Sequence, residues 1–254
     1  MNKRALVRRP GPRLAEGLLT HLQRVPVDLD LAMAQWEGYL AAMRAEGWDC
    51  LEVEAADLCP DAVFVEDTVI VYGDLAVISR PGADERKPET AGTEDALRNL
   101  GYRIERIEAP GTLDGGDVLK HEGTIWVGLG GRTNQAGVDQ LAAHLAPHGA
   151  RVIGVPVTKV LHLKSAVTAL PDGTVIGYPP LVDDTSVFPT FLEMPEEAGS
   201  HVVVLDDHTV LMSTSALASR ALLEERGLRV VAVDLTEFEK LEGCVTCLSV
   251  RLRG

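Results

Sequence analysis

The feature that most constrains the fold of this 254-residue chain is a unit that recurs about every fifty residues. Each copy reads as two short strands, a helix and a third strand. In the first copy the two strands occupy 63–79 and meet at Gly73-Asp74, the helix stops at Gly101, and the third strand covers 102–107. Units of this kind cannot bury their apolar faces alone, so the repeat predicts copies packed against one another.

Three further copies follow in order. The second covers 117–155, and its helix has apolar residues at helical spacing. The third begins with the hairpin 166–178, and prolines obscure the helix that should follow it. The fourth covers 202–234, with its helix at 215–226.

The two ends of the chain complete a fifth copy. The apolar segments 247–253 and 5–9 would pair as its hairpin, the helix around Trp36 would follow, and 48–53 would be its third strand. This pairing closes the units into a ring, whereas the alternative is an ordinary open α/β sheet. Because no linker or low-complexity segment divides the chain, we expect a single domain over 1–254.

Composition narrows the class of partner. The formal net charge of −14 repels nucleic-acid phosphates and anionic membranes and favours cationic ligands. No run approaches the roughly 18 apolar residues of a membrane span, and nothing at the start resembles a signal peptide. We therefore expect a soluble, cytoplasmic protein, whose four cysteines are thiols rather than a disulfide framework.

Polar residues interrupt the first strand of successive hairpins. These clusters are Asp61 with Glu66 and Asp67, Asp114 to Asp117, His162 with Lys164, and Cys244 with Cys247. Equivalent positions in a ring of repeats converge near its axis, so carboxylates, a histidine and a cysteine would meet in one cleft. Strand alternation would point His162 and Lys164 to one face, and would turn at least one of Glu66 and Asp67 inward.

Each cluster has a plainer interpretation. Cys244 and Cys247 form a C-x-x-C pair that could be redox-active or half of a zinc site, or could be two buried apolar residues. His162 could be a structural histidine, and the Asp114 cluster could be a turn. The glycine-rich segment 128–134 could hold a phosphate, but it lacks the nucleotide spacings, and its Arg132 suits a carboxylate better.

Six strings together carry a family resemblance: DAVFVEDTVIV, ISRPGADERKPE, IEAPGTLDGGDVL, GRTNQAG, VLHLKSAV and EGCVTCLSVRL. In this order and at these intervals they resemble the dimethylarginine dimethylaminohydrolases, of the guanidino-group-modifying (pentein) superfamily. The resemblance extends over essentially the whole chain. It implies a five-bladed α/β propeller of pseudo-repeated ββαβ units.

The resemblance also implies residue roles. Cys247 matches the nucleophile, His162 the acid and base, and Asp114 the carboxylate that orients them. The positions that match substrate-binding residues are Leu18, Asp61, Glu66, Asp67, Arg86, Arg132 and Leu241. Of these, Arg86 and Arg132 would hold the α-carboxylate, and the backbone carbonyls of Leu18 and Leu241 would accept from the α-amino group.

Two positions depart from the family pattern. Some bacterial members have Glu in place of Asp114, so the shorter side chain must be accommodated here. Mammalian members have a second cysteine where this chain has Leu248, so any role of that thiol is not carried over.

The implied reaction is hydrolysis of asymmetric dimethylarginine, and of ω-monomethylarginine, to citrulline and dimethylamine or methylamine. It runs through a covalent amidino-thioether on the cysteine and requires no metal or organic cofactor. The partner is then a small methylated arginine, without nucleic acid or membrane, and a homodimer is compatible with the sequence. Two alternatives stay open: another deiminase of the superfamily, acting on arginine or agmatine, and a non-catalytic propeller that binds ribosomes.

Overall fold

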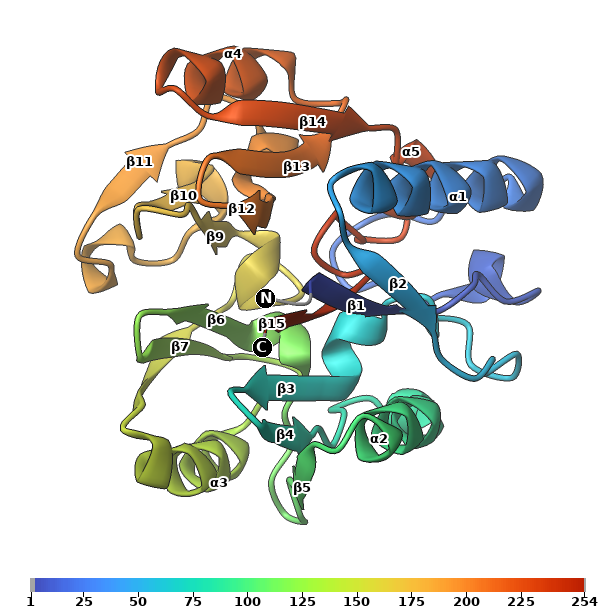
Figure 1. The fold of residues 1–254 in the computed structure, drawn as a ribbon, viewed down its shortest axis with the longest axis vertical. Coiled ribbons are helices and arrows are strands. Elements are labelled where there is room, and N and C mark those ends of the chain that lie inside the picture. Colours follow the sequence, from blue (N-terminus) through green and yellow to red (C-terminus); the bar gives the residue numbers. More distant parts are fainter. Residues whose placement is uncertain (1–2, 254) are drawn as a thin grey trace.

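The computed structural model describes residues 3–253, which form five three-stranded sheets around a central axis (Figure 1). In each sheet the middle strand pairs antiparallel with one neighbour and parallel with the other. The strands, sheet by sheet, are β15 (Val250–Arg253), β1 (Lys3–Val7), β2 (Asp49–Glu52); β3 (Val69–Tyr72), β4 (Leu75–Ile78), β5 (Arg103–Arg106); β6 (Val118–His121), β7 (Thr124–Leu129), β8 (Arg151–Pro156); β9 (Val167–Ala169), β10 (Val175–Gly177), β11 (Phe191–Glu193); β12 (Val203–Asp206), β13 (Thr209–Ser213), β14 (Arg229–Val233). The predicted five-bladed propeller is confirmed.

Helices connect the second and third strands of four sheets and lie at the periphery of the ring (Figure 1). They are α1 (Leu29–Ala45), α2 (Thr90–Asn99), α3 (Gln135–Leu145) and α4 (Leu217–Glu225). The connection between β10 and β11 contains two short 3-10 turns instead. Prolines at 179, 180 and 189 explain this difference, since proline cannot donate the hydrogen bonds of a helix interior.

The two ends of the chain close the ring as predicted. Strand β15 pairs antiparallel with β1, in a register that sets Lys3 opposite Arg253 and Leu6 opposite Val250. Figure 1 shows both ends of the chain near the centre of the molecule. Because β1 also pairs with β2, one blade is built from both ends of the sequence.

Five hydrophobic clusters, one between each pair of neighbouring sheets, form the core. Alternate residues of one strand enter different clusters. Leu6 packs against the β3–β5 sheet, whereas Ala5 and Val7 pack towards the β12–β14 sheet. The inner strands are therefore buried on both faces, which is why they read as nearly continuous apolar runs.

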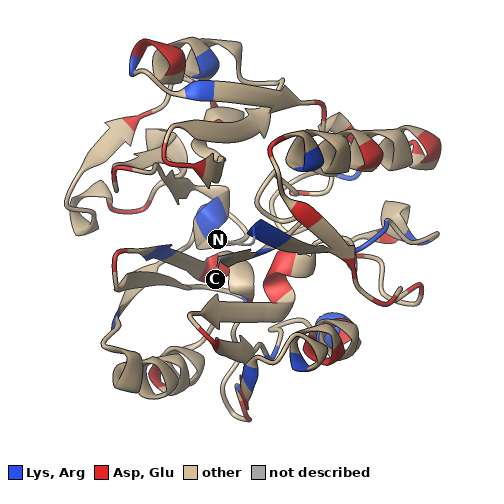
Figure 2. Cartoon of the chain, viewed as in Figure 1, with Lys and Arg blue, Asp and Glu red and all other residues tan. Residues whose placement is uncertain are grey.

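The polar clusters lie in or just before turns that precede the first strand of four blades. These inner turns are η2 (Val65–Thr68), η4 (Gly115–Asp117), η6 (Leu163–Ser165) and a turn at 245–248 before β15, and η9 (Glu197–Ser200) is the equivalent turn before β12. Acidic and basic turns lie close to the chain ends in the centre of Figure 2.

The expectation of extended strand at these positions is wrong. Strand β3 begins at Val69 rather than 63, β9 begins at Val167, and β15 begins at Val250. In a tight turn, alternation no longer decides which side chains share a face. As a result His162 and Lys164, which alternation would place on one face, line different cavities, and the buried side chains of Asp67 and Glu66 also point to different cavities.

Among the described residues, no helix has the length and apolar character that crossing a membrane requires.

Candidate active site

Eight of the ten predicted site residues line one small cavity near the axis. They are Leu18, Asp61, Asp67, Arg86, Arg132, His162, Leu241 and Cys247, and Phe64, Leu161, Glu242 and Gly243 complete the wall. The cavity measures about 10 Å³, which is the space of roughly one water molecule. Any larger ligand enters only if part of the wall moves.

Two glycines allow the inner turns to pack closely enough to build this site. A Cβ added to Gly115 would lie 2.1 Å from the carbonyl oxygen of Glu66. One added to Gly116 would lie 2.5 Å from Oδ1 of Asp67 and 2.7 Å from Nδ1 of His162. The Gly-Gly pair is therefore more than a turn signal, because it brings the acidic turn and the histidine together.

His162 lies between two carboxylates. Its Nε2 is 3.0 Å from Oδ2 of Asp114, and its Nδ1 is 3.8 Å from Oδ1 of Asp67. Burial alone would lower the pKa of His162, but the charge of Asp67 and the hydrogen bond to Asp114 raise it to about 9. The imidazole is thus a cation at neutral pH and can donate a proton.

Asp114 lies behind His162 rather than on the cavity wall. Its carboxylate is fully buried and also accepts a hydrogen bond from the backbone N–H of Gly82, at 2.9 Å. The shorter aspartate is thus accommodated, since it still reaches the imidazole. Its contacts suit a carboxylate that orients the histidine.

Arg86 is held by protein groups on all its nitrogens. Nη1 lies 2.6 Å from Asp67, Nε and Nη2 contact Glu89, and Nη2 also donates to the carbonyls of Asp61 and Phe64. Although burial opposes it, the charges of His162 and Arg86 hold the pKa of Asp67 well below its usual range. Arg86 therefore fixes Asp67 as a carboxylate, and could bind a substrate carboxylate only by releasing a present contact.

Arg132 has different surroundings. Its Nη1 is buried and has no hydrogen-bond acceptor among the described residues, and Oδ2 of Asp114 lies 3.8 Å away. A buried guanidinium donor without an acceptor is costly and suits an anionic ligand. At the start of the following helix, the side chain of Asn134 already accepts from Gly137, as a helix cap does. The segment 128–134 therefore presents its arginine to the cavity.

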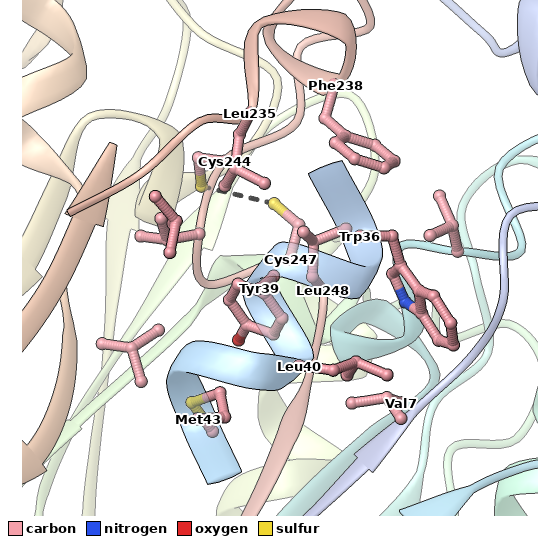
Figure 3. Close-up of a cluster of buried hydrophobic side chains, with 14 of the residues drawn as sticks. Val7, Trp36, Tyr39, Leu40, Met43, Leu235, Phe238, Cys244, Cys247 and Leu248 are labelled. Carbon is pink, nitrogen blue, oxygen red and sulfur yellow. Dashed lines mark hydrogen bonds between the residues drawn. The ribbon is translucent and has the colours of Figure 1, made fainter. Parts of the chain in front are cut away.

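Cys247 lies on the turn before β15, in contact with a second thiol. Its Sγ is 3.4 Å from Sγ of Cys244 (Figure 3). This hydrogen bond and burial raise the pKa of Cys247 well above its usual range. The carboxylates of Glu66 and Asp67 act in the same direction. A cation bound in the cavity would act in the opposite direction and favour the thiolate.

The segment that contains Leu18 covers the cavity. The backbone N–H of Leu18 donates to both oxygens of Asp61, at 3.2 and 3.1 Å. Further along, the N–H groups of Thr20, His21 and Leu22 all point at the carboxylate of Glu242. This segment is the least buried part of the wall, since 20–26 are exposed and polar contacts hold the segment, among them those of Arg24 with the carbonyls of Ala15 and Gly17.

Glu66 faces away from the cavity. Its Oε1 lies 2.6 Å from Lys164 Nζ and 2.6 Å from Arg251 Nη2, and it lines a larger central cavity of about 290 Å³. Its backbone N–H, by contrast, donates to the carbonyl oxygen of Cys247. Glu66 therefore touches the turn that contains Cys247 through its backbone, and its side chain lies on the other side of the inner turns.

Sequence reasoning gave no role to two residues that hold this arrangement together. The carboxylate of Asp117 accepts from the N–H of Leu163 and from the hydroxyl of Thr133, at 2.9 and 2.6 Å. The same hydroxyl accepts from the N–H of Asp114. Both residues lie inside strings that carried the resemblance, but only their contacts show that they position the turns of Asp114 and His162.

Asp67, Asp114 and His162 could also hold a metal ion, since one ligand atom of each lies within 4.8 Å of the others. Two carboxylates around an imidazolium give the same clustering without an ion, because the histidine itself supplies the positive charge.

Comparisons with known proteins find relatives along essentially the whole chain. A family model described as arginine deiminase matches residues 54–198. The chain is 61% identical to an N(G),N(G)-dimethylarginine dimethylaminohydrolase of Streptomyces coelicolor, with 99% of this chain and 98% of the relative aligned. The enzyme of the same name from Pseudomonas aeruginosa is 32% identical, over 99% of this chain and all of the relative.

This chain belongs to the dimethylarginine dimethylaminohydrolase family. A solved structure of the Pseudomonas aeruginosa member, a cysteine-to-serine mutant complexed with citrulline, matches with a TM-score of 0.91 and 32% identity, over 99% of this chain and 100% of that one. Another solved structure, of a dimethylarginine dimethylaminohydrolase with a histidine-to-glycine substitution as an adduct with S-methyl-L-thiocitrulline, matches with a TM-score of 0.91 and 31% identity, with the same coverage. The predicted family is confirmed.

Proposed function

We propose that this chain is a dimethylargininase, in which one catalytic domain spanning 1–254 converts asymmetric dimethylarginine to citrulline and dimethylamine. ω-Monomethylarginine would give citrulline and methylamine. The observation that carries the proposal is the cavity, where a cysteine and a histidine held between two carboxylates face an arginine with an unused donor.

The first half-reaction forms a covalent intermediate. Asp67, kept ionised by Arg86, attracts the substrate guanidinium and turns its face to Cys247. The bound cation lowers the pKa of the thiol, and the thiolate attacks the guanidinium carbon. His162, protonated at neutral pH, gives its proton to the departing dimethylamine as the carbon–nitrogen bond breaks.

The second half-reaction releases citrulline. His162 is now neutral and takes a proton from water, which attacks the carbon of the amidino-thioether. The carbon–sulfur bond breaks and restores Cys247. Asp114 keeps its hydrogen bond to His162 throughout and favours the protonated imidazole with which each turnover begins and ends.

The amino-acid end of the substrate is recognised by the outer part of the cavity. Arg132 would hold the α-carboxylate through its free Nη1, and Arg86 would assist once a contact is released. Asp61 and the backbone carbonyls of Leu18 and Leu241 would receive the α-amino group. Glu66 would act indirectly, through its contact with the backbone of Cys247.

The test is to incubate the purified chain with asymmetric dimethylarginine and to measure citrulline and dimethylamine. Cys247→Ser should abolish turnover without unfolding the chain, because a hydroxyl is far less ionised than a thiol at neutral pH. Parallel assays with arginine and agmatine decide the alternative of another deiminase. Turnover of either in preference to dimethylarginine would contradict the proposal, and no turnover of any would favour the non-catalytic alternative.

The expectations of a cytoplasmic location, a homodimer and no nucleic-acid partner stay predictions.

A further inference from the structure

Two thiols lie in contact beside the cavity, and the proposed reaction uses only one of them. Cys244 and Cys247 lie with their sulfur atoms 3.4 Å apart, within the hydrophobic cluster that includes Tyr39, Phe238 and Leu248 (Figure 3). Cys247 lines the cavity, whereas Cys244 lies just behind it. The mechanism leaves the second thiol without a role.

The backbone holds the two cysteines at a separation that a disulfide can span. The N–H of Cys247 donates to the carbonyl oxygen of Cys244 at 3.1 Å, which closes a β-turn. The first and last Cα atoms of such a turn are less than about 7 Å apart. This limit is close to the largest Cα separation found in disulfides, about 6.8 Å. A disulfide bond is about 2.05 Å long, so the sulfur atoms must approach by little more than about 1 Å.

The electrostatics of the pair favour loss of one proton. The hydrogen bond from Cys247 lowers the pKa of Cys244 against the opposing effect of burial. The charge of His201 and the hydroxyl of Thr246, 3.3 Å from the sulfur, act in the same direction. These opposite shifts favour loss of one proton from the pair, and the remaining proton can move along the hydrogen bond between the sulfur atoms.

We propose that Cys244 and Cys247 are a modification site, at which a hydroperoxide joins them in an intramolecular disulfide that reversibly removes the nucleophile. The disulfide itself goes beyond the proposed function. Only the loss of turnover rests on that function, because it assumes that Cys247 is the attacking thiol.

The oxidation balances with one equivalent of peroxide. The proton of Cys247 moves to Cys244 along their hydrogen bond, and the Cys247 thiolate attacks an oxygen of peroxide that has entered the cavity. The O–O bond breaks, the leaving hydroxide takes the proton from Cys244 to become water, and Cys247 becomes a sulfenic acid. Cys244, as thiolate, then attacks that sulfur, the S–O bond breaks, and a second hydroxide takes a proton and leaves as water.

The neighbouring thiol changes what oxidation does to the enzyme. A lone catalytic cysteine that is oxidised can proceed from sulfenic to sulfinic acid, which thiols do not reverse. Capture by Cys244 stops the process at a disulfide that thiols do reduce. Cys50 is the most exposed of the four cysteines, and among the described residues its thiol makes no hydrogen bond to another thiol, so Cys50→Ser is a matched control.

The experiment treats the reduced full-length chain with hydrogen peroxide, alkylates it in denaturant and maps the tryptic peptides by mass. Lys240 and Arg251 bound a single peptide, 241–251, that contains both cysteines. We expect this peptide to lose both alkylation sites and to be about 2 Da lighter than its reduced form. Dithiothreitol should restore both alkylation sites and citrulline production together.

The variants decide the outcome. Cys50→Ser should behave like the chain without substitutions. Cys244→Ser should lose activity in excess peroxide in a way that dithiothreitol does not reverse. Two results would overturn the proposal: activity lost while both thiols of 241–251 still react, or a mass of this peptide that shows oxygen added to a sulfur atom and no disulfide. If Cys244→Ser does not fold, the peptide mass of the chain without substitutions still decides. A disulfide in a chain that makes no citrulline from dimethylarginine would support this inference and reject the proposed function.

Discussion

Arg86 and Arg132 line the same cavity but have different partners. Replacing each arginine by alanine should therefore affect a different property of the chain. Arg132→Ala should raise KM for substrates with a free α-carboxylate by roughly 30-fold or more, since such a loss costs roughly 2–5 kcal/mol. Arg86→Ala should instead lower the free energy of unfolding by roughly 3–5 kcal/mol, because Asp67 and Glu89 would stay buried without their partner. Denaturant unfolding and KM for dimethylarginine and its α-amide measure both effects. Equal effects of the two variants on KM and on stability would contradict this assignment.

His162 should set the alkaline limit of activity. As an acid it works only when protonated, and its pKa is raised to about 9. The value of kcat/KM, which reports the free enzyme, should therefore fall as the pH rises through about 9 rather than through the usual histidine range. His208, an exposed residue, provides the control His208→Gln, which should leave the profile unchanged. A fall near pH 6.5 would show that the carboxylates do not hold the imidazolium.

At the scale of the secondary-structure elements, the packing of η2, η4 and η6 places the reacting groups. Gly116→Ala would insert a methyl group within contact of Asp67 and His162, so the turns must separate. We expect kcat to fall by about a hundredfold, because small displacements of catalytic groups have effects of that size. Gly38→Ala is the control: nothing lies within 4 Å of its added Cβ in α1, so it should stabilise the chain by about 0.5–1 kcal/mol and leave kcat unchanged. Similar kcat values for both variants would contradict this role of the inner turns.

The segment that contains Leu18 and covers the cavity is a second element, and the contacts that hold it in place can be tested. The backbone N–H groups of Thr20, His21 and Leu22 donate to the carboxylate of Glu242. Glu242 has a positive φ of 59° and precedes the turn that contains Cys247. Glu242→Gln removes the charge from these hydrogen bonds, so amide exchange at Thr20–Leu22 should become faster by about tenfold. Hydrogen–deuterium exchange of the peptide that covers this segment measures it, with Glu16→Gln as the control, since Glu16 pairs with Arg13. Unchanged exchange would mean that other contacts hold the segment.

At the scale of the whole molecule, the closed ring predicts tolerance to a circular permutation. Strands β1 and β15 lie side by side, so a short linker can join the ends of the chain. A new opening between Glu122 and Gly123, in the turn of the β6–β7 hairpin, would give a terminal strand pair of the same topology. We expect this permutant to fold and to retain activity, whereas deletion of 250–254 should prevent folding because it opens the ring. Circular dichroism and citrulline production test both. A folded deletion variant would show that closure is dispensable.

The amino-acid sequence by itself determined the blades, the ring closure and the meeting of cysteine, histidine and carboxylates. Apolar periodicity and turn residues are local signals, and an equivalent place in each repeat implies an equivalent place around the axis. Tertiary structure alone decided how neighbouring charges are shared: Glu66 pairs with Lys164 and Arg251, while Asp67 pairs with Arg86. It also decided that Asp114 lies behind the histidine and that Arg132 keeps a free donor. These outcomes depend on tight turns that cancel strand alternation, and on distances between residues far apart in the chain, which no local pattern records.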